Sequence, residues 1–262
     1  LNRVDKIMTK QKQSFQNTEY RFHRYLHNKI DLSSIGSNLI YDIYEDRTGV
    51  IWVATEWGGV SKFRFSTPKF KHFYSEQSNS NSLSNNIVYC FMKDTDDQLW
   101  IGTQEGLNKY NKAANTFEVI KKNPNDPNSL SNNQVISVIQ TKNNILWLGT
   151  AQGLNRYDPA NNKFKCFFID PDDPGTSCFM KLYESHDGTI WLGTYNFGLY
   201  RFDQKKEHFE KINPKINNQT TSLNDVIYSI TEDKNGVIWF GGAFQGGLYN
   251  YNPKTDEFKL FK

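Results

Sequence analysis

Ten side chains suited to ligand binding fall in short, variable stretches that follow a repeated tryptophan motif. They combine flat aromatic rings, which can stack on the C–H face of a sugar ring, with amides and carboxylates, which can hydrogen-bond its hydroxyls. The candidates are Glu56, Trp57, Gln104, Glu105, Gln152, Tyr195, Asn196, Phe197, Phe244 and Gln245. A second interpretation stays open for each aromatic residue, which could instead cover the top of the core. Function is favoured for Trp57 because it is outside the tryptophan repeat.

Catalytic chemistry is not expected from these residues. Glu56 and Glu105 could be imagined as the acid pair of a glycosidase, but two acids in adjacent turns are expected by chance. The stretch SHDGTIW at residues 185–191 is near a sialidase turn, yet Asp187 and Gly188 are adjacent, so the spacing fails. The segment is therefore predicted not to be an enzyme.

No cofactor or metal is expected either. The five histidines have no pairwise spacing typical of a metal site or a catalytic base near the candidate residues. The three cysteines form no CxxC pair, which argues against a zinc site and a disulfide framework. The 31 basic and 28 acidic residues give a net charge of +3 without a dense basic run. Nucleic-acid binding and membrane contact by this segment are therefore not expected.

The elements that position the candidates are set by a long repeat. Five tryptophans follow an Ile or Leu at intervals of 48, 47, 44 and 48 residues: Trp52, Trp100, Trp147, Trp191 and Trp239. A propeller blade takes about 40 to 50 residues. Each copy contains four extended segments joined by polar turns that are rich in Asn and Gly, as in QVISVIQ, ILWLGT, GLNRYD and KFKCFF of the third copy.

The fold predicted from this repeat is an all-β propeller of four-stranded antiparallel blades. One such sheet would expose two apolar faces, and stacking sheets around an axis buries both. The repeated tryptophans are then core residues between blades. An open β-solenoid is the rival architecture, but its rungs are usually shorter than 44 residues. The five predicted blades span residues 38–74, 86–122, 133–169, 177–212 and 225–262.

Residues 1–37 are interpreted as half a blade. LNRVD at the start matches LNRYD at residues 154–158, so it is predicted to be a third strand. Residues 20–28 fit a fourth strand, and the polar residues 6–19 between them are expected to form a surface loop. Half a blade leaves an open sheet edge. We therefore expect the remainder of the protein to complete a six- or seven-bladed ring.

The candidate residues lie in the turns between second and third strands. In a blade these turns open on the same face as the connections to the next blade, around the mouth of the central channel. The framework stays nearly constant while the turns vary, which is typical of binding loops on a rigid scaffold. A column in the innermost strands is also predicted to line the channel, with a ligand contact considered for its two charged members: Asp42, Cys90, Ser137, Lys181 and Ser229.

The repeated pattern, such as DPNSLSNNQV followed by LWLGTAQGLNRYDP, resembles the two-component regulator propeller repeat. The resemblance covers effectively the whole chain. It departs at residues 172–177, where DDPGTS replaces the SLSNN connection, at Ala54, and at GGAFQGG in the last copy. In that family such propellers form the extracytoplasmic sensor regions of hybrid two-component histidine kinases, notably in Bacteroidetes.

The resemblance implies a periplasmic sensor fragment of an inner-membrane protein. The ligand implied is an oligosaccharide released from a polysaccharide, bound at the loop face to control signalling. Downstream sensor domains and a homodimer of the complete sensor are implied partners, and any kinase activity would belong to other domains. The alternative is a protein-docking propeller without a small ligand, for which a broad apolar patch would be expected.

Overall fold

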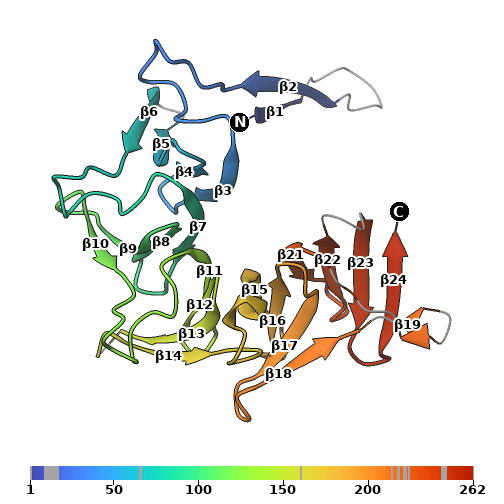
Figure 1. The fold of residues 1–262 in the computed structure, drawn as a ribbon. Helices are drawn as coiled ribbons and strands as arrows, with labels where there is room; N and C mark the ends of the chain where they lie inside the picture. Colours follow the sequence, from blue (N-terminus) through green and yellow to red (C-terminus); the bar gives the residue numbers. More distant parts are fainter. Residues whose placement is uncertain are drawn as a thin grey trace.

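The computed structural model is an open arc of five four-stranded antiparallel sheets that follow one another in chain order (Figure 1). It describes residues 2–8, 18–64, 67–159, 161–213, 215–216, 219–220, 223, 225–242 and 247–261. Within each sheet the strands pair in the order of the sequence, and the first strand of each lies on the inner side of the arc (Figure 1). The predicted all-β propeller architecture is confirmed.

The strands of the first three blades alternate with tight turns. The first blade contains β3 (Ile40–Glu45), β4 (Val50–Thr55), β5 (Val60–Arg64) and β6 (Thr67–Phe73). The second contains β7 (Val88–Lys93), β8 (Leu99–Thr103), β9 (Gly106–Asn111) and β10 (Thr116–Ile120). The third contains β11 (Val135–Gln140), β12 (Leu146–Thr150), β13 (Gly153–Asp158) and β14 (Lys163–Phe167).

The last two blades follow a short 3₁₀ helix, η1 (Pro174–Ser177). The fourth blade contains β15 (Phe179–Glu184), β16 (Ile190–Thr194), β17 (Leu199–Asp203) and β18 (His208–Ile212). The fifth contains β21 (Ile227–Glu232), β22 (Ile238–Gly242), β23 (Gly247–Asn252) and β24 (Glu257–Phe261). Two further short strands, β19 (Lys215–Ile216) and β20 (Gln219–Thr220), pair with each other and lie between these two blades in the sequence.

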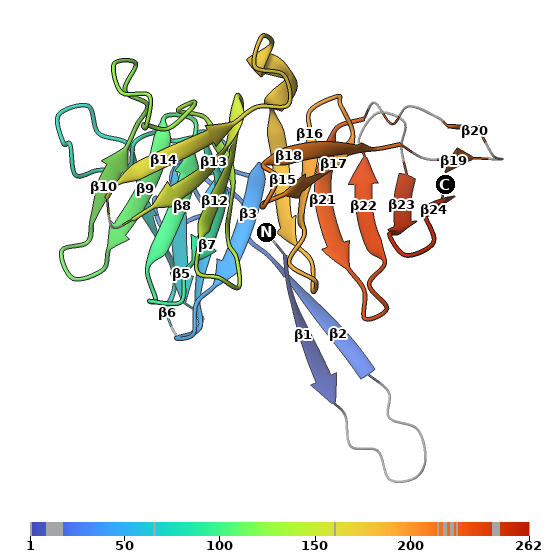
Figure 2. The ribbon, with the colours of Figure 1, turned by 90° about the horizontal axis from the view of Figure 1, so that it is seen from below.

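The N-terminal strands β1 (Asn2–Met8) and β2 (Thr18–Arg24) form a separate antiparallel hairpin. Figure 2 shows it extending away from the five blades. β1 ends later, and β2 begins earlier, than the sequence predicted, because residues 6–8 pair with residues 18–20. The fourth strand ends at Arg24 rather than at Asn28. The remainder of the expected loop, residues 9–17, lies outside the described residues.

Consecutive blades are held together by the repeated tryptophans. The first four are buried, and each indole packs at a steep angle on an aromatic ring from the third strand of the next blade. The ring centroids lie 5.3 to 5.8 Å apart in the pairs Trp52–Tyr110, Trp100–Tyr157, Trp147–Phe202 and Trp191–Tyr251. Edge-to-face pairs of this kind add about 0.5–1.5 kcal/mol to the burial of their area. Trp239 of the fifth blade is half-buried and stacks on Phe261 of its own sheet.

Candidate functional site

The turns between second and third strands are fixed by hydrogen bonds to the connections on either side. In the first blade the Glu56 amide donates to the Leu39 carbonyl at 3.0 Å, and the Gly59 amide donates to the Asn86 carbonyl at 3.0 Å. In the second blade the Gly106 amide reaches the Asn133 carbonyl at 2.7 Å. Turns and connections therefore share one face of the arc, as the sequence predicted.

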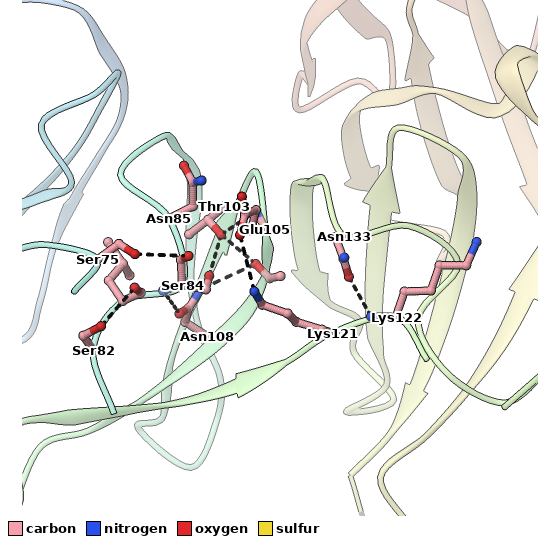
Figure 3. Close-up of polar contacts among 12 residues, drawn as sticks. Ser75, Ser82, Ser84, Asn85, Thr103, Glu105, Asn108, Lys121, Lys122 and Asn133 are labelled. Carbon is pink, nitrogen blue, oxygen red and sulfur yellow. Dashed lines mark hydrogen bonds and ion pairs between the residues drawn. The ribbon is translucent and has the colours of Figure 1, made fainter. Parts of the chain in front are cut away.

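The repeated SLSNN connection is explained by a polar network beneath these turns (Figure 3). The Ser84 amide donates to the Asn108 side chain at 2.9 Å, and Asn108 Nδ2 donates back to Ser84 Oγ at 2.8 Å. Ser84 Oγ also lies 2.7 Å from Thr103 Oγ1. The third blade repeats this arrangement with Ser131, Asn155 and Thr150. The network makes the connection and the base of each turn one rigid unit.

Several predicted site residues contact the turns and connections around them. Glu105 Oε2 accepts from Lys121 Nζ at 3.4 Å (Figure 3), and Gln152 Oε1 accepts from Asn132 Nδ2 at 3.2 Å. Phe197 is half-buried against the cluster that contains Trp147. Gln104, Tyr195 and Asn196 are exposed on the same face. Phe244 and Gln245 lie outside the described residues.

Trp57 is the most exposed tryptophan that the structure describes, with 71% of its surface accessible. Its backbone has φ of +66°, in the left-handed region that bulky residues rarely adopt. The equivalent position in the fourth blade is Asn196, with φ of +68°, and asparagine tolerates this conformation well. A large apolar side chain is therefore presented to solvent at a backbone position that suits a small polar one. Such strain is concentrated at functional sites.

A β-bulge recurs in the innermost strand of every blade. The strand pairing shifts register at the same point each time, between Ile40 and Asp42, Val88 and Cys90, Val135 and Ser137, Phe179 and Lys181, and Ile227 and Ser229. The residue at the shift is Tyr41, Tyr89, Ile136, Met180 or Tyr228. Bulges redirect side chains and often lie next to active sites. The sequence prediction missed these residues.

Three of the bulged residues take part in a cluster at the mouth of the channel, here called the mouth cluster: Tyr41, Glu56, Tyr89, Gln134 and Tyr228. The rings of Tyr41 and Tyr89 lie 5.4 Å apart at 50°. Gln134 Nε2 donates to the Tyr89 hydroxyl at 2.9 Å. Burial, together with the charge of Glu56 and a hydrogen bond to it, raises the pKa of Tyr41 to about 12. Tyr228 contributes a smaller electrostatic effect on Tyr41 from the fifth blade. Four blades thus supply aromatic, carboxylate and amide groups to one place.

The predicted channel column has a structural role at three joints between blades. Asp42 Oδ2 accepts from the Phe91 amide of the next blade at 2.8 Å, and Ser137 Oγ accepts from the Leu182 amide at 3.1 Å. The Val138 amide donates in the same way to the sulfur of Cys90. Burial raises the pKa of Asp42. Lys181 has no acceptor atom and is exposed, so the joint between the fourth and fifth blades lacks this bridge.

The comparison with known families identifies these repeats. The model of the two-component regulator propeller matches residues 34–57, 82–105, 129–152 and 221–244. The chain carries two-component regulator propeller repeats. Each match ends at one of the candidate residues, which are Trp57, Glu105, Gln152 and Phe244. The matched ranges do not include the fourth blade, where residues 172–177 replace the usual connection.

Solved structures with the same fold include two extracellular domains from Bacteroides thetaiotaomicron. The extracellular domain assigned to a hybrid two-component system is 28% identical, with a TM-score of 0.71 over 90% of this chain and 32% of that one. The extracellular domain assigned to a one-component system is 23% identical, with a TM-score of 0.67 over 90% of this chain and 28% of that one. The chain with its propeller repeats thus spans about a third of the length of these structures.

Virginiamycin B lyase from Staphylococcus aureus shares the fold alone, at 11% identity and a TM-score of 0.64 over 100% of this chain and 74% of that one. No curated protein matches the sequence. Among the described residues, no group of three potential metal ligands is placed to hold an ion. None of the described helical segments is long and apolar enough to cross a membrane.

Proposed function

We propose that this chain is the ligand-sensing part of an extracytoplasmic two-component regulator and binds an oligosaccharide at the channel mouth. The observation that carries the proposal is Trp57, an exposed indole on a strained backbone, which follows Glu56 in the chain; the Glu56 carboxylate is hydrogen-bonded to Tyr41. A sugar ring can stack on the indole, while the mouth cluster offers hydroxyl, carboxylate and amide groups to its hydroxyls.

The firm attachment of the turns at the channel mouth to the blades supports a binding role. The turn that carries Trp57 is held by the amides of Glu56 and Gly59, which donate to the carbonyls of Leu39 and Asn86. Ligand binding would therefore order few residues and lose little conformational entropy. The charge of the mouth cluster suits an uncharged glycan better than an anionic one, since Glu56 is its one acidic member and it has no basic member. The proposal makes the chain a binding module without catalytic activity.

The location proposed is outside the cytoplasmic membrane, in the periplasm. The support is the propeller repeat and the two similar sensor regions, both of which are extracellular domains. The chain spans about a third of those structures, so we propose that further parts of the same protein complete the ring and pass the signal on.

A thermal-shift screen against plant, host and microbial oligosaccharides tests the proposal. Saturation at 100 times the dissociation constant adds about 2.7 kcal/mol to the free energy of unfolding. For a chain of this size, that corresponds to a rise in the unfolding midpoint of roughly 5 to 10 °C. The rise is expected with one class of glycan and not with unrelated ones.

Trp57→Asn is the matched variant because asparagine occupies the same backbone conformation in the fourth blade. It is expected to keep the fold and lose the glycan-induced rise. Lys163→Gln, on the outer strand β14, is the control and should keep the full rise. A glycan that stabilises Trp57→Asn as much as the unaltered chain would contradict this site. No response to any glycan, in a chain that melts cooperatively, would favour the protein-docking alternative.

A further inference from the structure

The joints between blades are also bridged on the opposite face of the arc. The last residue of an innermost strand accepts from a backbone amide in the turn between the first and second strands of the preceding blade. Gln140 Oε1 accepts from Thr95 at 2.8 Å, and Glu184 Oε2 accepts from Lys142 at 2.9 Å. Glu232 Oε2 accepts from the His186 amide at 2.7 Å. Three consecutive joints are therefore closed by an acceptor side chain.

The joint between the first and second blades departs from this pattern. Lys93 occupies the position of the acceptor, and a lysine ammonium can only donate. It forms an ion pair with Asp97 of its own blade. Arg47 occupies the position equivalent to Thr95 in the preceding turn. Lys93 and Arg47 therefore both line this joint, where the other joints have a hydrogen bond. The joint contains a cavity of about 90 Å³.

The cavity is lined by an excess of positive charge. Its basic residues are Arg47, Lys62, Arg64, Lys93 and Lys112, and its acidic residues are Asp46 and Asp97. Both carboxylates are already engaged. Asp97 pairs with Lys93, and Asp46 accepts hydrogen bonds from Thr48, Val50 and the Trp52 indole.

Lys62 is the cation of this set that lies over the aromatic rings between the two blades. It is half-buried, with Nζ 4.6 Å from the centre of the Trp52 ring and 6.0 Å from the centre of the Tyr110 ring. Burial and the neighbouring charges of Lys71, Arg64 and Lys112 lower its pKa. Among the described residues no carboxylate lies within ion-pair distance of Lys62. An anion in the cavity would offset both unfavourable effects.

The next joint shows that this charge is specific to one place. The surface between the second and third blades is lined by Asp94, Asp96 and Lys109, so acidic groups outnumber basic ones. Lys109 is the equivalent of Lys62 and also lies over a tryptophan, with Nζ 5.6 Å from the centre of the Trp100 ring. Lys109 is therefore a matched control for Lys62 within the same chain.

We propose that the crevice between the first and second blades binds an oxyanion, a sulfate or phosphate group, between Lys62, Arg64 and Lys112. The cavity of about 90 Å³ is large enough to hold one such group. Charge-assisted hydrogen bonds from Lys and Arg are the usual recognition of these groups. This site is on the face opposite the tryptophan tip, so it does not depend on glycan binding there.

Equilibrium dialysis against radiolabelled sulfate and, separately, radiolabelled inorganic phosphate tests the proposal at an ionic strength fixed with chloride. One saturable site is expected for at least one of the two ions. Lys62→Gln and Arg64→Gln are each expected to weaken binding about tenfold, because each removes one charged contact. Lys109→Gln is expected to bind as the unaltered chain does. Competition by a sugar sulfate ester would identify a glycan-borne group, and competition by free ions alone would identify the inorganic ion.

Unfolding midpoints of all three variants are measured first. Arg64 is exposed at the rim of the crevice, so Arg64→Gln is expected to fold and carries the test if Lys62→Gln does not. The proposal is overturned if the chain shows no saturable site for either ion. It is also overturned if Lys109→Gln weakens binding as much as the two crevice variants.

Discussion

Thr141 occupies the turn position whose side chain accepts from the indole in other blades, but it does not accept a hydrogen bond from Trp147. Trp147 Nε1 is buried without a hydrogen-bond partner, while Thr141 Oγ1 donates to the Ile145 carbonyl at 3.2 Å. In three other blades an aspartate at the same position accepts from the indole, at 2.8 to 3.3 Å, in the pairs Asp46–Trp52, Asp94–Trp100 and Asp233–Trp239. The third blade therefore keeps an unsatisfied donor that its neighbours do not have.

Thr141→Asp is expected to raise the stability of the third blade. An aspartate would accept from Trp147 Nε1 and from the turn amides, as Asp94 does with the amides of Asp96 and Gln98. The gain should be about 1 kcal/mol, which is the typical net contribution of a hydrogen bond. Urea unfolding followed by tryptophan fluorescence measures it. Thr141→Val supplies no acceptor and is the control, and a loss of stability in the aspartate variant would refute this account of the indole.

Trp57→Asn is expected to stabilise the chain when no ligand is present. The substitution relieves a left-handed backbone strain of about 1 kcal/mol or more. Because the indole is exposed, little burial is lost with it. The reciprocal variant Asn196→Trp should be destabilised by a similar amount, since it places an indole at the other left-handed position. Calorimetric unfolding of both variants checks the pair, and a destabilised Trp57→Asn would show that the indole packs against the fold.

The titration of Tyr41 reports on its contact with Glu56. Burial, the Glu56 charge and the hydrogen bond to Glu56 raise the pKa of Tyr41 from 10.0 to about 12. The folded pKa thus exceeds the unfolded one, so the stabilisation is present below pH 10 and is lost as the pH rises to about 12. Glu56→Gln should lower this pKa toward 10 and weaken the loss of stability over that range.

Nuclear magnetic resonance of tyrosines labelled at the ring carbon measures this pKa. Tyr41→Phe assigns the signal, and Glu105→Gln is the control because Glu105 pairs with Lys121. A Tyr41 pKa that is the same in the unaltered chain and in Glu56→Gln would show that burial alone causes the shift.

Lys181→Ser is expected to strengthen the joint between the fourth and fifth blades. Serine at the equivalent position of the third blade accepts from the Leu182 amide, and Ile230 is the corresponding residue of the fifth blade. The new hydrogen bond should add about 1 kcal/mol. Amide exchange at Ile230 should slow relative to the unaltered chain. An exchange rate that does not change would mean that no bridge forms there.

The fold could be predicted from the sequence because its signal is repeated. The interval between the tryptophans and the apolar strands around them define the blades and place Trp57 outside the core. The first four repeated indoles pack between blades on a third-strand ring of the next blade, in agreement with their predicted place in the core.

The mouth cluster could be predicted only in part. Glu56 and Trp57 were found because they vary within a constant frame. Tyr41 and Tyr89 were missed because a β-bulge shifts the register by one residue, which changes the face on which a side chain lies. Alternation of apolar and polar residues does not reveal such a shift. Glu105 was chosen because it carries a carboxylate in one of the variable turns, and its contact with Lys121 could not be inferred without the structure.

The recurring bulge takes one residue of each innermost strand out of the regular pairing of its sheet. Four of these residues are exposed or half-buried: Tyr41, Tyr89, Met180 and Tyr228. The fifth, Ile136, is buried and belongs to the core. If the channel mouth binds a ligand as proposed, a combinatorial library at the four accessible positions would change ligand specificity while the strand framework stays the same.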